Sequence, residues 1–257
     1  MIRVKTPEQI ERLAEAGGLV MACHALAREM IRPGVTTREI DEAVERYVRK
    51  AGATPAWKGI EGPAGAPNFP SITCMSTDEQ VVHGFPSDVP LEEGQILSVD
   101  IGVRTRDGWY GDAARSHIVG NVTDPKKKEL IDETRAALEK AAAGMVPDSH
   151  LGDIGHTIQS HVEALGFSVV RELVGHGIGL ELWEQPQVPN YGKAGRGLKL
   201  REGMVLCVEP MINMGTFEVK VLKDGWTVVT ADGKPSAHVE HMIAITANGP
   251  RILTPDA

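Results

Sequence analysis

The sequence predicts an α+β fold in which helices cover the outer face of a curved, mostly antiparallel sheet. The main observation is an internal repeat. Residues 91–100 (LEEGQILSVD) return as residues 200–209 (LREGMVLCVE), offset by 109 positions, with five of ten residues identical. Each copy is a turn signal, an apolar strand and a final acid. Two helical patterns precede the strands in each half, which is too long a unit for a solenoid. We therefore expect one domain, 1–257, with pseudo-symmetric halves of about 1–123 and 124–257.

The first half opens with two predicted helices. Residues 6–9 (TPEQ) have the pattern of a capping box with proline in the first turn, and apolar residues then recur at helical spacing. The pair Gly17–Gly18 lowers helix stability by roughly 1 kcal/mol per glycine, which indicates close contact with a neighbouring element. Residues 36–39 (TTRE) predict the start of the next helix, which ends at Gly52.

The second half repeats this plan. Asp124 opens a helix that runs to about Gly144, and Pro147 precedes another helix that stops at Gly166. In both halves a proline stands seven residues before three apolar residues spaced by four, which are Ile40, Val44 and Val48 in one and Ile154, Ile158 and Val162 in the other. The duplication therefore extends over helices as well as strands.

Composition excludes several functional classes. The chain is 42% hydrophobic and 24% charged, and its formal net charge of −8 argues against nucleic-acid binding. Its three cysteines lie far apart without a C-x-x-C pair, as in a reduced intracellular protein. With no signal-peptide pattern and no apolar run of about 18 residues, we expect a cytoplasmic protein with no membrane association.

Two acids fall on neighbouring strands of a predicted hairpin. Asp100 ends one apolar strand, Asp112 lies on the returning strand, and a five-residue loop over 104–108 would set them directly opposite each other. Facing carboxylates repel unless a cation lies between them or one of them is protonated. A solvated hairpin face is the alternative, but the apolar residues from 96 to 103 indicate a buried strand, where unpaired acids are costly.

A histidine and a third acid occur in similar apolar surroundings. His176 lies within residues 175–179 (GHGIG), where the glycines would leave room for a substrate backbone, and Leu180 breaks a dinucleotide-binding pattern. Glu240 lies in the apolar run 239–245 without a Lys or Arg beside it. With Glu209, which ends the second copy of the repeat, these residues make four carboxylates and one imidazole. Such a set suits Mn(II), Fe(II), Co(II) or Zn(II), and two divalent ions would neutralise all four acids.

These residues occur in strings that resemble the methionine aminopeptidases, metallopeptidases of the pita-bread fold. The matching strings are 81–86 (VVHGFP), 98–100 (SVD), 111–112 (GD), 175–179 (GHGIG), 208–210 (VEP), 224–227 (DGWT) and 239–241 (VEH). The resemblance covers essentially the whole chain. The short segment between Glu209 and Glu240 is similar to the type I, bacterial class. The resemblance implies a monomeric enzyme that hydrolyses the initiator methionine from peptides and nascent proteins, with the ribosome as one place of encounter.

The resemblance also implies roles for the matched residues. Asp100 would bind one metal ion, His176 and Glu209 would bind the other, and Asp112 and Glu240 would bridge the two. A bridging water would attack the scissile carbonyl while Glu209 exchanges protons with it. His83 would contact the substrate and stabilise the tetrahedral intermediate. The methionine pocket would be built from Phe69, Cys74, Leu182 and Trp226.

One position departs from the family. A second histidine normally follows the first after seven residues, where it contacts the substrate amide, but this chain has Trp183 there. An indole N–H donates one hydrogen bond and cannot accept a proton. His238, two residues before Glu240, would share its strand face and could replace part of the missing imidazole; the alternative is an ordinary polar residue at the rim.

The sequence is also compatible with two other functions. The first is a related peptidase with altered specificity, such as an X-Pro dipeptidase, which Trp183 keeps open; proline-specific relatives usually carry a further N-terminal domain. The second is a catalytically silent domain of the same fold that binds partners. Such relatives typically lose metal ligands, whereas all five ligand positions are retained here.

Overall fold

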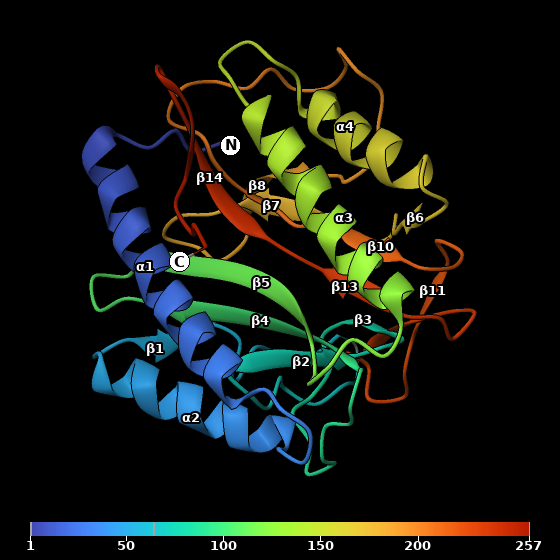
Figure 1. The fold of residues 1–257 in the computed structure, drawn as a ribbon. Coiled ribbons are helices and arrows are strands. Elements are labelled where there is room, and N and C mark those ends of the chain that lie inside the picture. Colours follow the sequence, from blue (N-terminus) through green and yellow to red (C-terminus); the bar gives the residue numbers. More distant parts are fainter. Residues whose placement is uncertain (1, 64, 257) are drawn as a thin grey trace.

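The computed structural model describes residues 2–63 and 65–256. Its helices are α1 (Pro7–Met30), α2 (Thr37–Lys50), α3 (Pro125–Ala143) and α4 (Leu151–Glu163). Figure 1 shows them as two pairs, α1 with α2 and α3 with α4, and in this view α1 and α3 lie in front of the strands. The helices predicted in both halves are confirmed, each within a few residues of its expected bounds.

Local side chains explain where the helices begin. Thr6 accepts a hydrogen bond from Gln9 N while the Gln9 side chain accepts one from Thr6 N, and Thr36 and Glu39 form the same capping box on α2. The structure explains one of the two adjacent glycines in α1. A Cβ on Gly17 would lie 2.3 Å from Leu253 O, so the C-terminal segment requires glycine there, whereas a Cβ on Gly18 would meet open space.

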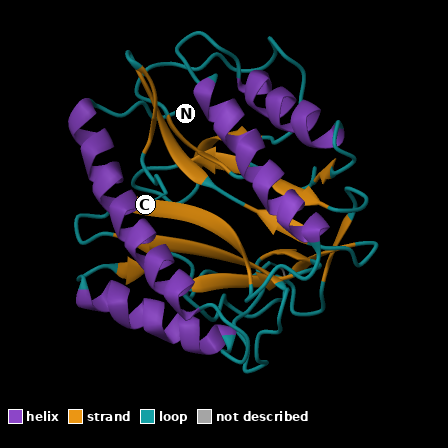
Figure 2. Cartoon of the chain, viewed as in Figure 1, coloured by secondary structure: helices purple, strands orange, loops and turns teal. Residues whose placement is uncertain are grey.

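The strands pair antiparallel throughout the described residues, as predicted (Figure 2). They form four sheets of three to five strands, with orders β1-β4-β2 (β5 also pairs with β4), β13-β10-β6, β11-β12-β3 and β15-β14-β9-β7-β8. The strand bounds are β1 (Thr54–Pro55), β2 (Thr73–Thr77), β3 (Gln80–Val82), β4 (Ile96–Arg104), β5 (Tyr110–Ile118), β6 (Ser168–Val169), β7 (Gly175–Gly177), β8 (Glu184–Val188), β9 (Val205–Val208), β10 (Met211–Asn213), β11 (Val219–Val221), β12 (Val228–Thr230), β13 (Ser236–His238), β14 (His241–Thr246) and β15 (Gly249–Ile252).

A seam of hydrogen bonds joins β5 to the segment between β13 and β14. Glu240 N donates to Ala114 O at 2.9 Å. Ser116 Oγ accepts from His238 N and donates to His238 O, each at 2.9 Å. Residues from distant parts of the sequence therefore lie side by side along β5, in the middle of the molecule (Figure 1).

The hydrophobic core follows the two helix pairs. Ile40 and Val44 of α2 pack with Val99 and Ile101 of β4 in one cluster. A second cluster lies beneath α3 and α4, and includes Leu130, Leu138, Ile154, Ile158, Ile212 and Ile243. Burying each such side chain contributes roughly 1.5–3 kcal/mol, which makes the strands a firm support for polar groups between them. Within the described residues, none of the helices combines the length and apolar character needed to cross a bilayer.

The hairpin of β4 and β5 corrects one prediction. Asp100 lies opposite Ala114, and Asp112 lies opposite Gly102, so the two acids are diagonal neighbours on one face and not directly opposite each other. The loop does have five residues, but it spans 105–109, one position later than expected. Thr105 N donates to Trp109 O at 2.8 Å and closes the turn there, which fixes the register.

Candidate metal centre

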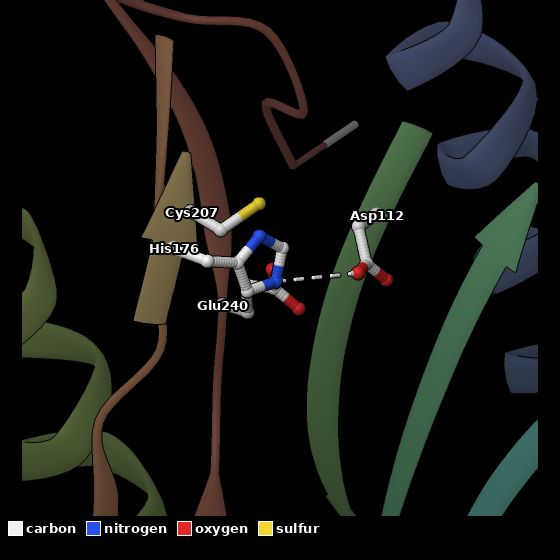
Figure 3. A group of neighbouring side chains, drawn as sticks. All are labelled: Asp112, His176, Cys207 and Glu240. Carbon is white, nitrogen blue, oxygen red and sulfur yellow. Dashed lines mark ion pairs between the residues drawn. The ribbon is translucent and has the colours of Figure 1, made fainter. Parts of the chain in front are cut away.

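Five separate segments bring the predicted ligands together. Asp100 is in the middle of β4 and Asp112 near the start of β5, while His176 is the central residue of β7. Glu209 follows the last residue of β9, and Glu240 lies between β13 and β14. The structure thus gathers residues from both halves of the chain, and Figure 3 shows Asp112 facing His176 and Glu240 across a narrow gap.

The distances at this site are too long for direct hydrogen bonds and suit a shared ion. His176 Nε2 lies 3.5 Å from Glu209 Oε1 and 3.8 Å from Asp112 Oδ2. Ligand atoms that share one cation at about 2.0–2.2 Å from it lie roughly 3–4 Å from one another. Asp112, His176, Cys207 and Glu240 each offer a ligand atom within 4.8 Å of the others.

The tautomer of His176 strengthens this argument. Its Nδ1 lies 2.9 Å from Gly177 O, and because a carbonyl only accepts, Nδ1 carries the proton. Burial lowers the pKa of His176 to about 4, so the ring is neutral near pH 7 and Nε2 presents a lone pair. A lone pair that faces the carboxylates of Glu209 and Asp112 is repulsive unless a cation or proton lies between them. The backbone bond also orients the ring as a metal-ligating histidine requires.

The carboxylates are unfavourable in charged form without a counter-ion. Burial, and then the charge of Glu240, raises the pKa of Asp100 to about 7. Burial also raises the pKa of Asp112, Glu209 and Glu240 well above the usual range, with further contributions from the neighbouring carboxylates. Among the described residues, three buried acceptor atoms in this group have no hydrogen-bond partner, namely Asp100 Oδ1, Asp112 Oδ1 and Glu240 Oε1. These oxygen acceptors, with the free Nε2 of one neutral imidazole, fit divalent cations.

Cys207 is an addition to the predicted group. The sequence indicates only that it shares a face with Glu209 and fills core space. In the structure it lies opposite His176 in the β7–β9 pair, and its sulfur is close to the ligand atoms (Figure 3). Burial and the nearby carboxylates raise the pKa of this thiol well above its usual range, so it is protonated near pH 7.

The glycines around His176 have a different purpose from the one expected. A Cβ on Gly175 would lie 2.2 Å from Cys207 O, and a Cβ on Gly177 would lie 2.5 Å from Gln185 O. The room they provide is occupied by β9 and the start of β8, not reserved for a substrate backbone. The glycines let three strands approach closely and thereby fix the imidazole.

A cavity of about 440 Å³ opens in front of these ligands. All five predicted ligand residues line it, together with His83 and His238. His83 has φ +59, an uncommon left-handed conformation for a non-glycine residue. His238 is buried instead of lying at a rim, and its Nε2 is 3.8 Å from Glu209 Oε2. Both imidazoles have lowered pKa values because they are buried, with His83 at about 4.

The predicted methionine-pocket residues lie behind this cavity. Phe69, Cys74, Leu182 and Trp226 are buried together in one apolar cluster and are not among the described residues that line the cavity. Their aromatic rings support the wall: the Trp226 ring is 6.2 Å from that of His83, and Phe69 is 5.1 Å from Trp226. The wall that these residues support includes Trp57.

Trp183 lines the mouth of the cavity, where about half of its surface is exposed. Its ring centroid is 5.6 Å from that of Trp57, in a tilted arrangement. The sequence singled out Trp183 through a motif, but Trp57 lies in no motif and was missed. An indole pair therefore forms one side of the entrance.

A buried ion pair at the same entrance was also missed. Lys5 Nζ donates to Glu184 Oε2 at 2.6 Å, and both side chains are almost fully buried. Arg3 adds a bond to Glu184 and another to Glu181. Because these partners lie about 180 residues apart, no local pattern could have paired them. They tie the N-terminal segment to the loop that carries Trp183.

The comparison with protein families decides the classification. The description "Metallopeptidase family M24" matches residues 11–247, most of the chain. The chain belongs to metallopeptidase family M24. This confirms the predicted family and hydrolase class. A protein from Clostridium perfringens named "Methionine aminopeptidase" is 48% identical over 254 residues, which are 99% of each chain. A "Methionine aminopeptidase 1" from Bacillus subtilis is 45% identical with the same coverage.

Solved structures of similar proteins agree with the fold. A methionine aminopeptidase from Thermotoga maritima has a TM-score of 0.93 at 46% identity, covering 99% of both chains. One from Rickettsia prowazekii has a TM-score of 0.95 at 39% identity, covering 99% of this chain and 100% of that one. A prolidase from Pyrococcus horikoshii has a TM-score of 0.76 at 24% identity, and this chain covers only 64% of it. That likeness shows the fold alone, and the predicted pita-bread fold is confirmed.

Proposed function

We propose that this M24 enzyme removes the N-terminal methionine of peptides and nascent proteins with two divalent metal ions. The observation that carries the proposal is the lone pair of neutral His176, which faces the oxygens of Glu209 and Asp112 at 3.5 and 3.8 Å. The names of the full-length relatives favour methionine as the residue removed.

The ligand set supports two ions. Asp100 would hold one, His176 and Glu209 the other, and Asp112 and Glu240 would bridge them. Four ionised carboxylates carry a formal charge of −4, which two divalent ions balance. Such ions polarise a carbonyl and acidify water near neutral pH. Co(II), Mn(II), Fe(II) and Zn(II) all suit this donor set, and cellular supply decides among them.

Proton transfer and stabilisation of the transition state would be carried out by the protein's own side chains. Glu209 is the ligand best placed to hold and return a proton, because its side chain lies between two imidazoles in the cavity. His83, neutral near pH 7, can donate a hydrogen bond to the oxygen that becomes negative in the transition state. We assign His238 a supporting role beside Glu209, where it would partly replace the imidazole that the resemblance to the family implies at the position of Trp183.

The apolar cluster behind the cavity suits a methionine side chain. Phe69, Cys74, Leu182 and Trp226 give soft, apolar surroundings that favour a thioether. Their placement one layer behind the lining means that a methionine would reach them only after Trp57 or its neighbours adjust. We propose that this cluster forms the floor of the substrate pocket.

Partners and location follow from the substrate. N-termini of new chains become available at the ribosome in the cytoplasm, and we propose that a monomer acts there. The net charge of −8 makes direct nucleic-acid recognition unfavourable.

A single assay tests the function and its alternative. Purified protein is supplied with Co(II) or Mn(II) and offered Met-Ala-Ser and a set of X-Pro dipeptides. Preferential release of methionine is expected from wild type, and Trp183→His should change the KM more than the metal content. Faster turnover of X-Pro dipeptides would replace the proposal with the altered-specificity enzyme. Absence of bound metal and of all turnover would favour a silent binding domain. If His238→Ala hydrolyses Met-Ala-Ser at the wild-type rate, the supporting role of His238 is wrong.

A further inference from the structure

A second cavity lies on the opposite side of β5 from the metal centre. Its volume is about 290 Å³, and its polar lining comes from α1, β5, α3 and the C-terminal segment, through His24, Arg28, Arg115, His117, Arg135 and Asp256. Side chains alternate along a strand, so Arg115 and His117 point away from the face that carries Asp112. The two cavities therefore share one strand but no lining residue.

The second cavity collects buried nitrogen atoms that lack partners. Of the buried side-chain atoms without a hydrogen bond in the described residues, the oxygens of Asp100, Asp112 and Glu240 lie at the metal centre. Three nitrogens belong to residues that line the second cavity, namely His24 Nδ1, His117 Nε2 and Arg135 Nε. Since unpartnered polar atoms are costly to bury, two such concentrations indicate two separate ligand sites.

The charges of the second cavity indicate that its ligand is an anion. Three guanidinium groups and one carboxylate give a formal charge of +2, in a chain whose net charge is −8. Asp256 Oδ1 accepts from Arg115 Nε at 2.6 Å, while Asp256 Oδ2 is 4.0 Å from Arg135 Nε. Arg115 is further occupied by the carbonyls of Glu240 and Thr254. Asp256 thus satisfies Arg115, and Arg28 and Arg135 carry the positive charge that it leaves uncompensated.

We propose that this cavity binds a small dianion of the phosphate class, held by Arg28 and Arg135 against the walls formed by His24 and His117. Guanidinium groups bind tetrahedral oxyanions through paired, charge-assisted hydrogen bonds. The volume is just below the usual range of about 300–1,000 Å³ for small-molecule sites, so the ligand is an inorganic phosphate or a small phosphate monoester.

His24 adds a feature that suits a protonated phosphate oxygen. Its Nε2 lies 2.9 Å from Ala113 O and must be the donor, and burial lowers the pKa of the ring to about 3. The neutral ring therefore keeps an acceptor at Nδ1. Hydrogen phosphate offers both negative oxygens for the arginines and one O–H for this nitrogen.

Isothermal titration of the metal-loaded enzyme with inorganic phosphate tests the proposal, with chloride at matched ionic strength as reference. Phosphate also has affinity for divalent ions, so variants distant from the metal centre separate the two sites. Arg135→Gln should raise the Kd about tenfold, as expected for loss of a hydrogen bond to a charged group. Asp256→Asn should lower it severalfold, because a competing negative charge is removed. Arg46→Gln, on the exposed face of α2, is the matched control and should leave the Kd unchanged.

If phosphate binds in this cavity, the arginine and aspartate variants change the Kd in opposite directions. The proposal is overturned if phosphate binds wild type and Arg135→Gln equally, if Asp256→Asn weakens binding, or if no heat exceeds that of chloride. Arg28→Gln, at an exposed position near the end of α1, repeats the test should Arg135→Gln fail to fold. Glycerol phosphate titrated in parallel shows whether a monoester is accepted as well as free phosphate; binding of either supports the site.

Discussion

A single methyl group added at Gly175 should disable the metal centre. The Cβ of an alanine would lie 2.2 Å from Cys207 O and 3.3 Å from the Glu209 Cγ. Relaxed contacts between such atoms are about 3.5 Å, so β7 must move away from β9 by about 1 Å. His176 Nε2 is now 3.5 Å from Glu209 Oε1, and ligand–metal distances tolerate only small changes around about 2.1 Å. A 1 Å error in a catalytic group costs on the order of 100-fold in rate.

We therefore expect Gly175→Ala to lose about 100-fold in kcat/KM on Met-Ala-Ser and to bind metal more weakly. Overpacking should also lower the free energy of unfolding by about 1–3 kcal/mol. Metal content by mass spectrometry, steady-state kinetics and urea denaturation measure the three quantities on one preparation. Excess metal should restore part of the activity, because the ligands remain present but misplaced.

Substitutions at two other glycines distinguish misplaced metal ligands from a general loss of stability. A Cβ on Gly152 in α4 would lie 2.4 Å from Lys193 O, away from the cavity, so Gly152→Ala should lose similar stability while the folded enzyme keeps its metal affinity. Gly18→Ala meets open space within α1 and should gain about 0.5–1 kcal/mol. If Gly175→Ala keeps metal and turnover within a fewfold of wild type, the geometric reasoning for this site is wrong.

Three further outcomes follow from the same structure. Glu209→Gln should fold normally, yet lose about 100- to 10,000-fold in kcat/KM through loss of proton exchange; near-normal turnover would contradict the assigned role. Asp100→Asn should stabilise the chelator-treated protein. The pKa of Asp100 is raised from 3.8 to about 7 in the folded protein, so folding favours its protonated form. The stability of wild type is therefore unaffected by this acid below pH 4 and falls by about 4 kcal/mol as the pH rises to 7. Urea titrations with EDTA at pH 4 and pH 7.5 measure this, and a pH-independent difference from wild type would refute it. Lys5→Met should cost about 3 kcal/mol, because Glu184 stays buried with weaker partners; an unchanged urea midpoint would contradict this.

The sequence predicted the helices and singled out the five residues that the structure brings to one cavity, because both signals depend on local chemistry. Capping boxes and four-residue apolar spacing determine where helices begin and which face is buried, and these signals lie within a few residues of each other. Acids in otherwise apolar strands are equally visible, since burial without a partner is costly for any fold. The register of Asp100 and Asp112 was wrong by one residue in each strand because a bond inside the turn, from Thr105 to Trp109, decides it.

The walls of the cavity could not be predicted, because they depend on contacts between distant residues. Trp57 meets Trp183 from a segment with no recognisable motif, and Lys5 finds Glu184 at a separation of 179 residues. The Arg115 network likewise reaches from β5 to the last residues of the chain. Such pairs leave no periodic signal in one sequence, although each is energetically substantial once formed.

The internal repeat supplies two equivalent acids, and the residue after each makes them different. Asp100 is followed by further strand residues and is held by pairing with both β2 and β5. Glu209 is followed by Pro210, which has no N–H to continue the ladder, and β9 ends at Val208. Asn190 Nδ2 donates to the Glu209 carbonyl at 3.0 Å and anchors the backbone there. The Glu209 side chain therefore reaches into the cavity from a strand end, whereas Asp100 stays inside a sheet. This difference supports the proposal that Glu209 exchanges protons with the substrate, while Asp100 would only hold a cation.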